Sequence, residues 1–424
     1  MDNTSIKPQN LPEKLVWYYI VGTFIAYYLG SQFVATPLLA FFLVFYLIKK
    51  WWNQTDETPE SERIAISLTV WIWIFAMLTI EMCIIVSHIN YDLGLVQIIR
   101  TSVGWARQWG LFALFPLAGH LRIRPQIIYR AVCILSLQCV IVVVLDNLVS
   151  LFHLPVLSFT SPLKVLGGGN SLYTVKFFNN SIAQRNDFQL FAGWPTILGL
   201  ISVIYFHFAC QDLDKRWRRI GIWSYTFLVF ASQSRVAILS FAITLFVSKV
   251  LTNWFRPKAL FITGLIASLS GIALPKAVDL LLAVKNFFDN YRGKDSADSG
   301  QLRSYINRMT LARWQSESPI WGHGVIEEFG NGPRITYGIP LGTHSTWFAI
   351  LYNHGVVGFF ALALAFLCSF LTLTISSQSS ELSRMGLTII IVLVIFGFSE
   401  PLQVWAYIYW APLLILGMAL NKSP

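Results

Sequence analysis

The chain has 424 residues, of which 55% are hydrophobic and 12% are charged, and its formal net charge is +10. Its mean hydropathy of +0.59 excludes an ordinary water-soluble protein, because most of these residues cannot be meant for contact with water. The apolar runs are continuous over helix-spanning lengths and do not alternate in strands of about ten residues, which disfavours a transmembrane β-barrel. The sequence therefore predicts an all-α, polytopic integral membrane protein.

Twelve candidate spans follow one another along the chain, some of them short or broken, because a helix needs roughly 17 to 25 apolar residues to cross a bilayer. They are expected at about residues 15–30, 33–48, 64–89, 105–120, 127–152, 187–210, 219–233, 236–252, 259–275, 355–376, 386–399 and 404–420. The first span is followed by no small-residue cleavage site, so we expect it to be retained.

Compact basic clusters follow the second, fourth, sixth and eighth spans. They consist of Lys49 and Lys50; Arg122, Arg124 and Arg130; Lys215, Arg216, Arg218 and Arg219; and Lys249, Arg256 and Lys258. Because positive charge accumulates in cytoplasmic loops, this alternation places both termini in the cytoplasm and the long loop on the opposite side. We expect three units, namely residues 1–275 with nine spans, a helical loop subdomain at 276–354, and residues 355–424 with three spans.

Helical periodicity recurs within the long loop. Residues 276–291 and 301–318 are expected to form helices, with a loop at 291–300 between them. A short helix is expected at 345–353, ended by His354 and Gly355, because glycine just after the last periodic residue favours a helix end. Three arginines of the helix expected at 301–318 do not share one face, so at most one or two of them should reach any one site. These arginines are Arg303, Arg308 and Arg313.

Several other classes of function are disfavoured. All five cysteines lie in or beside apolar runs, so neither a disulfide nor a zinc site is indicated. The basic residues punctuate spans and do not form a soluble basic domain, which favours membrane topology over nucleic-acid binding. His323 and Glu327 have the spacing of metal ligands on a helix, but Gly324 between them makes a helix doubtful, and we expect neither a metal nor another cofactor. No P-loop, dinucleotide fingerprint or hydrolase motif is present.

Three ionisable residues lie at span ends on the predicted outer side, where a charge is costly without a partner. Arg185 precedes the sixth span, and Arg235 lies between the seventh and the eighth. Ser232 or Ser234 can cap a helix that begins near Arg235, which would set free backbone N–H groups beside a guanidinium and suit a phosphate. The alternative is that these arginines contact lipid headgroups.

The third such residue is His344. The positive end of a helix dipole disfavours the imidazolium, so a histidine at a helix start tends to stay neutral, as a general base must. A purely structural histidine is the alternative.

The motifs around these residues resemble those of bacterial O-antigen ligases and their relatives. The loop carries an arginine-tryptophan helix ending in MTLARW, then the P-x-x-G-x-G turn PIWGHG with Gly322 and Gly324, then HSTWFAILYNHGVVG. In the last motif His344 is followed by Leu351, Gly355 and Gly358 at the family's spacing, with serine where asparagine is usual at the next position. The SQSR element at Ser232 to Arg235 is similar to the S-x-S-R element of the same superfamily.

The resemblance implies a GT-C-like glycosyltransferase that works without a metal and inverts the anomeric centre. Its donor would be a glycan on undecaprenyl pyrophosphate, its acceptor the lipid A core, and its site the periplasmic face of the inner membrane. His344 would then take the acceptor proton, and Arg235 and Arg185 would hold the pyrophosphate. Substrate contacts are also expected from Arg303, Arg308, Arg313, Ser232, Ser234, Gly322 and Gly324.

The sequence is also compatible with other functions. An O-antigen polymerase or a protein O-oligosaccharyltransferase shares parts of the motif set. A transporter for an anionic lipid-linked glycan would also have many spans, but such proteins usually place their polar site near the bilayer midplane. The candidates here cluster at one face.

Overall fold

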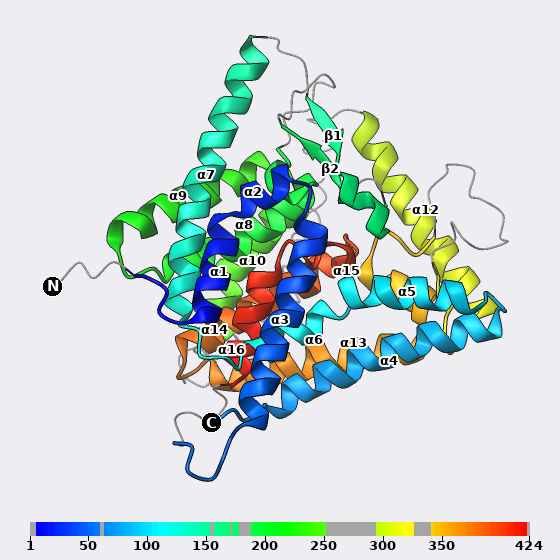
Figure 1. Cartoon of the computed structure of the whole chain (residues 1–424). Coiled ribbons are helices and arrows are strands. Elements are labelled where there is room, and N and C mark those ends of the chain that lie inside the picture. The colour runs from blue at the N-terminus through cyan, green and yellow to red at the C-terminus, as the bar shows by residue number, and fades with distance from the viewer. Residues whose placement is uncertain are drawn as a thin grey trace, which may run out of the picture.

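The computed structural model describes residues 6–59, 63–152, 157–169, 172–177, 188–251, 294–325 and 341–421. Figure 1 shows a bundle of helices with one small β-hairpin beside it. The α-helices are α1 (Leu11–Val21), α2 (Thr23–Tyr28), α3 (Gln32–Trp52), α4 (Leu68–Asn90), α5 (Leu95–Arg107), α6 (Leu111–Ala118), α7 (Pro125–Leu151), α8 (Pro195–Cys210), α9 (Lys215–Ala231), α10 (Arg235–Leu251), α12 (Lys294–Glu317), α13 (Thr346–Ser376), α14 (Glu381–Gly397), α15 (Leu402–Trp405) and α16 (Trp410–Asn421). The hairpin pairs β1 (Ser158–Thr160) with β2 (Thr174–Lys176) in antiparallel register, and 3-10 turns lie at Pro162–Leu166 and Leu190–Ala192.

The prediction of a mostly helical membrane protein is confirmed. Among the described residues, α3, α4, α7 and α13 are long and apolar enough to cross a membrane, and α8, α16 and the first part of α10 are shorter apolar helices. The span expected at 15–30 is divided between α1 and α2, and the spans expected at 105–120 and 404–420 contain the short helices α6 and α16 after the ends of α5 and α15. The expected span at 259–275 lies outside the described residues, so twelve spans stay a prediction.

Two local expectations need correction. The loop expected at 291–300 is wrong for residues 294–300, which form the first turns of α12. Serine, aspartate and glycine are as common at a helix start as in a loop, so composition alone could not separate the two. The hairpin of β1 and β2 is absent from the sequence-based expectations, because its strands are only three residues long and give no readable alternation. The expected helix at 276–291 lies outside the described residues.

The centre of the bundle is α16. Every residue from Trp410 to Leu420 is buried, as expected for a helix that is apolar on all sides. Gly417 lets α16 contact α6 closely, because a Cβ atom at this position would overlap the backbone of Pro116. The outer surfaces of the longer helices are also apolar. On α3, Leu38 and Phe45 are 63% and 68% exposed, which fits a lipid-facing side.

Two of the basic residues form ion pairs with buried carboxylates and hold helices together. Arg124 holds Glu13, which is 1% exposed, through Nε to Oε1 at 2.8 Å and Nη2 to Oε2 at 2.9 Å. Arg130 holds Asp212 through two hydrogen bonds of 2.8 Å. Two of the cations that predict topology therefore also fasten α1 and the α8–α9 link to α7. Bidentate geometry compensates the burial of both carboxylates.

The helix break predicted at His354 and Gly355 is confirmed. α13 is interrupted at Gly355, whose φ of 64° and ψ of −167° lie outside helical geometry. A break inside a buried helix leaves backbone donors and acceptors without their usual partners, and these must be satisfied by another segment. The segment Pro319 to Gly324 does this here, and we call it the clamp loop.

The clamp loop lies directly in the break. The N–H of Val356 donates to the carbonyl of Pro319 at 2.9 Å, and the N–H groups of His323 and Gly324 donate to the carbonyls of Tyr352 and Asn353, each at 2.8 Å. From the other side, the hydroxyl of Ser87 on α4 donates to the carbonyls of Trp321 and Gly322. The PIWGHG motif therefore joins the end of α12 to α13 and α4.

Glycine is required in the clamp loop for two reasons. Gly322 has φ +72°, and a Cβ atom there would overlap the backbone of residues 353–355. Gly324 has φ +74°, and a Cβ atom there would lie 2.7 Å from the Cβ of Ser87. Packing and backbone conformation together account for both glycines.

We predict that Gly322→Ala lowers the free energy of unfolding by about 2–4 kcal/mol, through positive-φ strain of about 1 kcal/mol and overpacking of about 1–3 kcal/mol. The control is Gly104→Ala in α5, where φ is not positive and no atom lies within 4 Å of the added Cβ, so stability should not fall. Thermal unfolding of both variants in the same detergent measures the difference. Equal losses of stability would contradict the close packing of the clamp loop.

Candidate functional site

The SQSR element forms a capped helix start. The hydroxyl of Ser234 accepts a hydrogen bond from the N–H of Ala237 at 3.2 Å, and α10 begins at Arg235. Ser232 stabilises the turn before it, donating to the carbonyl of Val229 at 2.7 Å and accepting from the N–H of Ser234 at 3.3 Å. The predicted cap is confirmed and belongs to Ser234. The half-buried Arg235 thus stands at the positive end of a helix.

His344 is half-buried and lies two residues before α13. Its neighbours fix it to the α14–α15 link. The hydroxyl of Ser345 donates to the carbonyl of Gly397 at 3.0 Å, and the N–H and hydroxyl of Thr346 donate to the carbonyl of Glu400 at 3.2 and 2.7 Å. The backbone that carries His344 is therefore anchored directly after this residue.

Burial lowers the pKa of His344, and the positive charge of Arg303 lowers it further. The imidazole is therefore neutral at neutral pH and can accept a proton. The direction predicted from the sequence agrees with the structure, but the physical cause differs. Burial and a neighbouring guanidinium lower this pKa, whereas the sequence pattern pointed to the helix dipole.

Glu400 is the residue that sequence reasoning missed. It lies in the α14–α15 link, is 5% exposed, and its Oε1 atom is 3.8 Å from Nη1 of Arg303. Within the described part of the chain, this Oε1 atom has no hydrogen-bond partner. Burial raises the pKa of Glu400 to about 7, against the lowering effects of Arg303 and of a hydrogen bond with the side chain of Thr196. The signal in the sequence was an acid directly after an apolar run, in FGFSEP.

The first turns of α8 connect Glu400 with the SQSR element. Thr196 in the first turn contacts Glu400 through its side chain. One turn further, a Cβ atom on Gly199 would lie 2.6 Å from the Cβ of Ala237 and 2.9 Å from the hydroxyl of Ser232. The capped start of α10, the buried carboxyl and the His344 turn therefore lie at the same end of the bundle.

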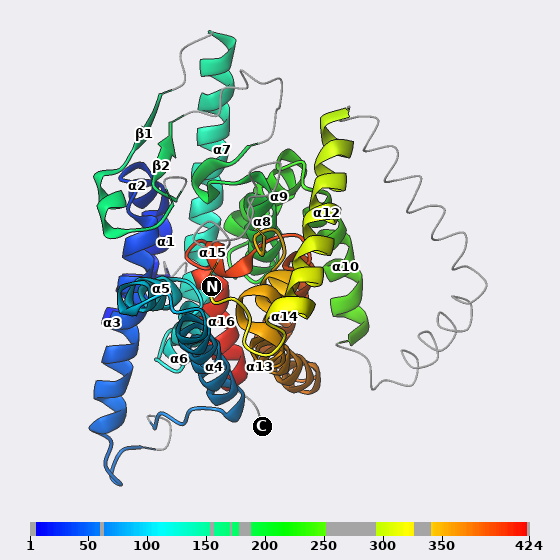
Figure 2. The same cartoon turned by 90° about the vertical axis from the view of Figure 1, so that its right-hand side faces the viewer.

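The arginines of α12 separate as their spacing predicted. Arg303 approaches Glu400 and donates to the carbonyl of Ser399 at 3.4 Å, whereas Arg308 is exposed. Arg313 is held by Glu317 on the same helix through hydrogen bonds of 2.8 and 3.0 Å. α12 itself lies against α13, as Figure 2 shows. Of the three, Arg303 is placed near His344, and Arg185 lies outside the described residues.

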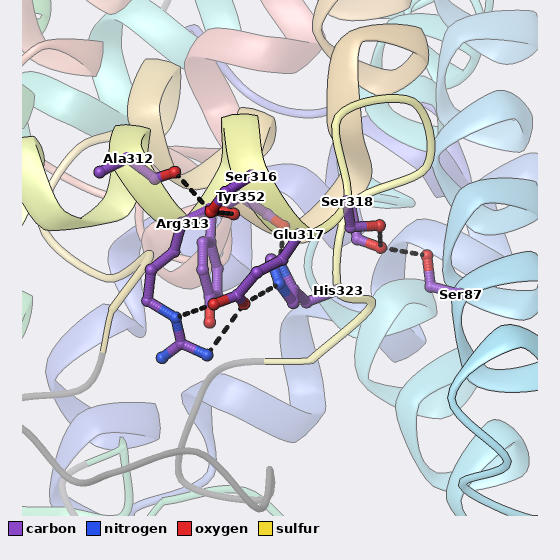
Figure 3. Close-up of polar contacts among 9 residues, drawn as sticks. Ser87, Ala312, Arg313, Ser316, Glu317, Ser318, His323 and Tyr352 are labelled. Carbon is purple, nitrogen blue, oxygen red and sulfur yellow. Dashed lines mark hydrogen bonds and ion pairs between the residues drawn. The ribbon is translucent and has the colours of Figure 1, made fainter.

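His323 has a structural environment. Its Nε2 lies 2.9 Å from Oε2 of Glu317 and its Nδ1 lies 3.0 Å from the carbonyl of Tyr352, as Figure 3 shows in part. The ring stacks on Tyr352, with centroids 4.2 Å apart, and on Tyr91, with centroids 5.6 Å apart. Both ring nitrogens are thus engaged within the protein, which does not favour a metal ligand. Glu327 lies outside the described residues.

The chain has helices that can span a membrane, and a neutral histidine and arginines lie at one end of the bundle. The protein is therefore a helical integral membrane protein with a polar site at one end. Within that class, residues 220–363 match the family model described as O-antigen ligase. The matched segment contains the SQSR element, the clamp loop, Arg303 and His344, so the resemblance drawn from the motifs is confirmed there. No curated protein matches the chain. The match supports, in coarse terms, an enzyme of the O-antigen ligase or polymerase type.

Glu400 allows a stability prediction with a defined sign. A carboxyl whose pKa is raised on folding contributes stability that is present below its ordinary pKa of 4.5 and is lost as pH rises through about 7. We expect Glu400→Gln to match the wild type near pH 4.5 and to be more stable at pH 8, by about 3 kcal/mol. Thermal unfolding between pH 4.5 and 8 measures this. A variant that is less stable than the wild type at pH 8 would refute the assignment.

Proposed function

We propose that the chain is an O-antigen ligase. It transfers O-antigen polysaccharide from undecaprenyl pyrophosphate to the lipid A core, without a metal and with inversion of the anomeric centre. The observation that carries this proposal is the neutral His344 at the end of the bundle where the capped start of α10 presents Arg235. One group suits a proton acceptor and the other a diphosphate.

The reaction needs few chemical groups from the protein. His344 takes the proton from the acceptor hydroxyl as its oxygen attacks the anomeric carbon. The bond between this carbon and the pyrophosphate oxygen breaks, and undecaprenyl pyrophosphate leaves with the electron pair. Arg235, the N–H groups at the start of α10 and Arg185 stabilise the charge on the leaving diphosphate. Because diphosphate is a good leaving group, positioning of the two substrates supplies much of the rate enhancement.

The membrane setting follows from the same proposal. Both substrates are anchored in lipid, so a site at the end of the bundle meets the headgroup region of one leaflet. We place this end in the periplasm and both termini in the cytoplasm, because the basic clusters of the sequence follow the even-numbered spans. The units at 1–275, 276–354 and 355–424 are part of this proposal.

Three alternatives differ from the ligase in the acceptor or in the chemistry. A polymerase would use a second lipid-linked repeat as acceptor, and a protein O-oligosaccharyltransferase would use a protein hydroxyl. A transporter of lipid-linked glycans has no need for a neutral histidine fixed beside cations. We therefore favour a glycosyltransferase over a transporter.

We predict that His344→Ala lowers transfer at least about 100-fold, because a general base contributes roughly 10²- to 10⁴-fold. Arg235→Lys should also be severely impaired, since an ammonium replaces a bidentate fork. Arg100→Lys on exposed α5 is the matched control and should transfer normally. Attachment of glycan to lipid A core is measured in a ligase-deleted strain, with the amount of folded protein verified by detergent gel filtration. Normal attachment by His344→Ala would exclude the mechanism.

Complementation of two deletion strains distinguishes ligase from polymerase. Restored polymer on lipid A core in the ligase-deleted strain is the expected result. Restored chain length only, in the polymerase-deleted strain, would assign the chain to the polymerases.

We predict that Arg303→Gln moves the acid limb of the pH–rate profile to higher pH. Arg303 lowers the pKa of His344, so its removal lets the imidazole take up a proton at a higher pH, and the protonated ring cannot act as a base. The profile of residual transfer, normalised to its own maximum, measures the shift. Arg308→Gln on the exposed face of α12 serves as control and should leave the limb in place. A shift to lower pH would contradict the electrostatic role of Arg303.

A further inference from the structure

Arg303 and Arg313 lie on the same helix but have different partners. The guanidinium of Arg313 is neutralised by Glu317 through two short hydrogen bonds. Arg303 makes one long hydrogen bond to Ser399 and lies 3.8 Å from Glu400, too far for a hydrogen bond. Its side chain is 41% exposed. Among the described residues, most of its five N–H donors are thus open to an incoming anion.

Glu400 faces Arg303 with an oxygen that lacks a hydrogen bond within the described chain. This carboxyl is buried, and its other described contact is the side chain of Thr196. Among the described residues, the charged group that faces it is Arg303 from α12, and the neutral imidazole of His344 before α13 lies across Arg303. An ionised Glu400 attracts the Arg303 guanidinium, and a protonated one leaves that positive charge uncompensated.

We propose that Glu400 is a positioning residue that competes with the diphosphate for Arg303, so that binding of the anion at this end of the bundle is coupled to proton uptake by Glu400. The inference rests on the proposed function for the identity of the anion. The coupling itself follows from the 3.8 Å pair, the burial of the carboxyl and the open donors of Arg303.

The coupling has a definite sign. A diphosphate near Arg303 adds negative charge beside Glu400 and favours its protonated form, so one proton passes from solvent to the carboxyl as the anion binds. By linkage, raising the pH ionises Glu400 and weakens anion binding. Because the pKa of Glu400 is raised to about 7, this dependence falls in the physiological range.

The test is calorimetric titration of the detergent-solubilised full chain with inorganic pyrophosphate between pH 6 and 8.5. We expect the ratio of the wild-type Kd to the Glu400→Gln Kd to rise about fivefold or more across this range. The ratio of the two Kd values cancels the effect of pH on the ionisation of pyrophosphate itself, because both proteins bind the same ligand. Titrations in two buffers of different ionisation enthalpy should show that the wild type takes up more protons on binding than Glu400→Gln at pH 7.5.

Two further variants make the result specific. Glu317→Gln is the matched control, because it makes the same change beside Arg313, and its Kd ratio to the wild type should stay flat with pH. Arg303→Gln should weaken binding and remove the pH dependence. A constant ratio between the wild type and Glu400→Gln, or equal proton uptake, would overturn the coupling. Failure of the ligase proposal would be seen separately, as no attachment of glycan to lipid A core when the wild-type chain is expressed in the ligase-deleted strain.

Discussion

The break in α13 at Gly355 is the constraint on which the arrangement of the site depends. Buried backbone groups freed by a break must find partners, and the clamp loop supplies them from a segment well upstream in the chain. This contact fixes the end of α12 against α13 and so carries Arg303 toward the His344 turn. A glycine-rich motif with the composition of a polar loop therefore acts as backbone packing, and the glycines Gly322 and Gly324 are explained without contact to a substrate.

The charged residues on and beside α12 are arranged in two ways. Arg313 and Glu317 form a closed pair next to His323, which holds the α12 end in place. Arg303 and Glu400 are close but not hydrogen-bonded, and the carboxyl is buried. A buried carboxyl with an unsatisfied oxygen lowers stability, so its presence beside an open guanidinium and a neutral histidine is typical of a functional site.

Several features of the site were predictable because they depend on short stretches of chain. The serine cap before Arg235, the break after His354 and the separation of the α12 arginines all follow from local hydrogen bonding or helical spacing. Glu400 was not predictable in the same way. Its partner Arg303 is 97 residues earlier, so no local pattern indicates that an acid in FGFSEP faces a cation.

The sequence by itself determined the membrane class, the distribution of basic residues, the capped helix start and the motif segment that matches the O-antigen ligase family. These depend on composition and on neighbours within a few residues, where the physical chemistry is local. The tertiary structure decided that some expected spans are divided between short helices, that the clamp loop fills the break in α13, and that Glu400 faces Arg303. Such contacts join segments far apart in the chain, and their geometry depends on how the helices pack.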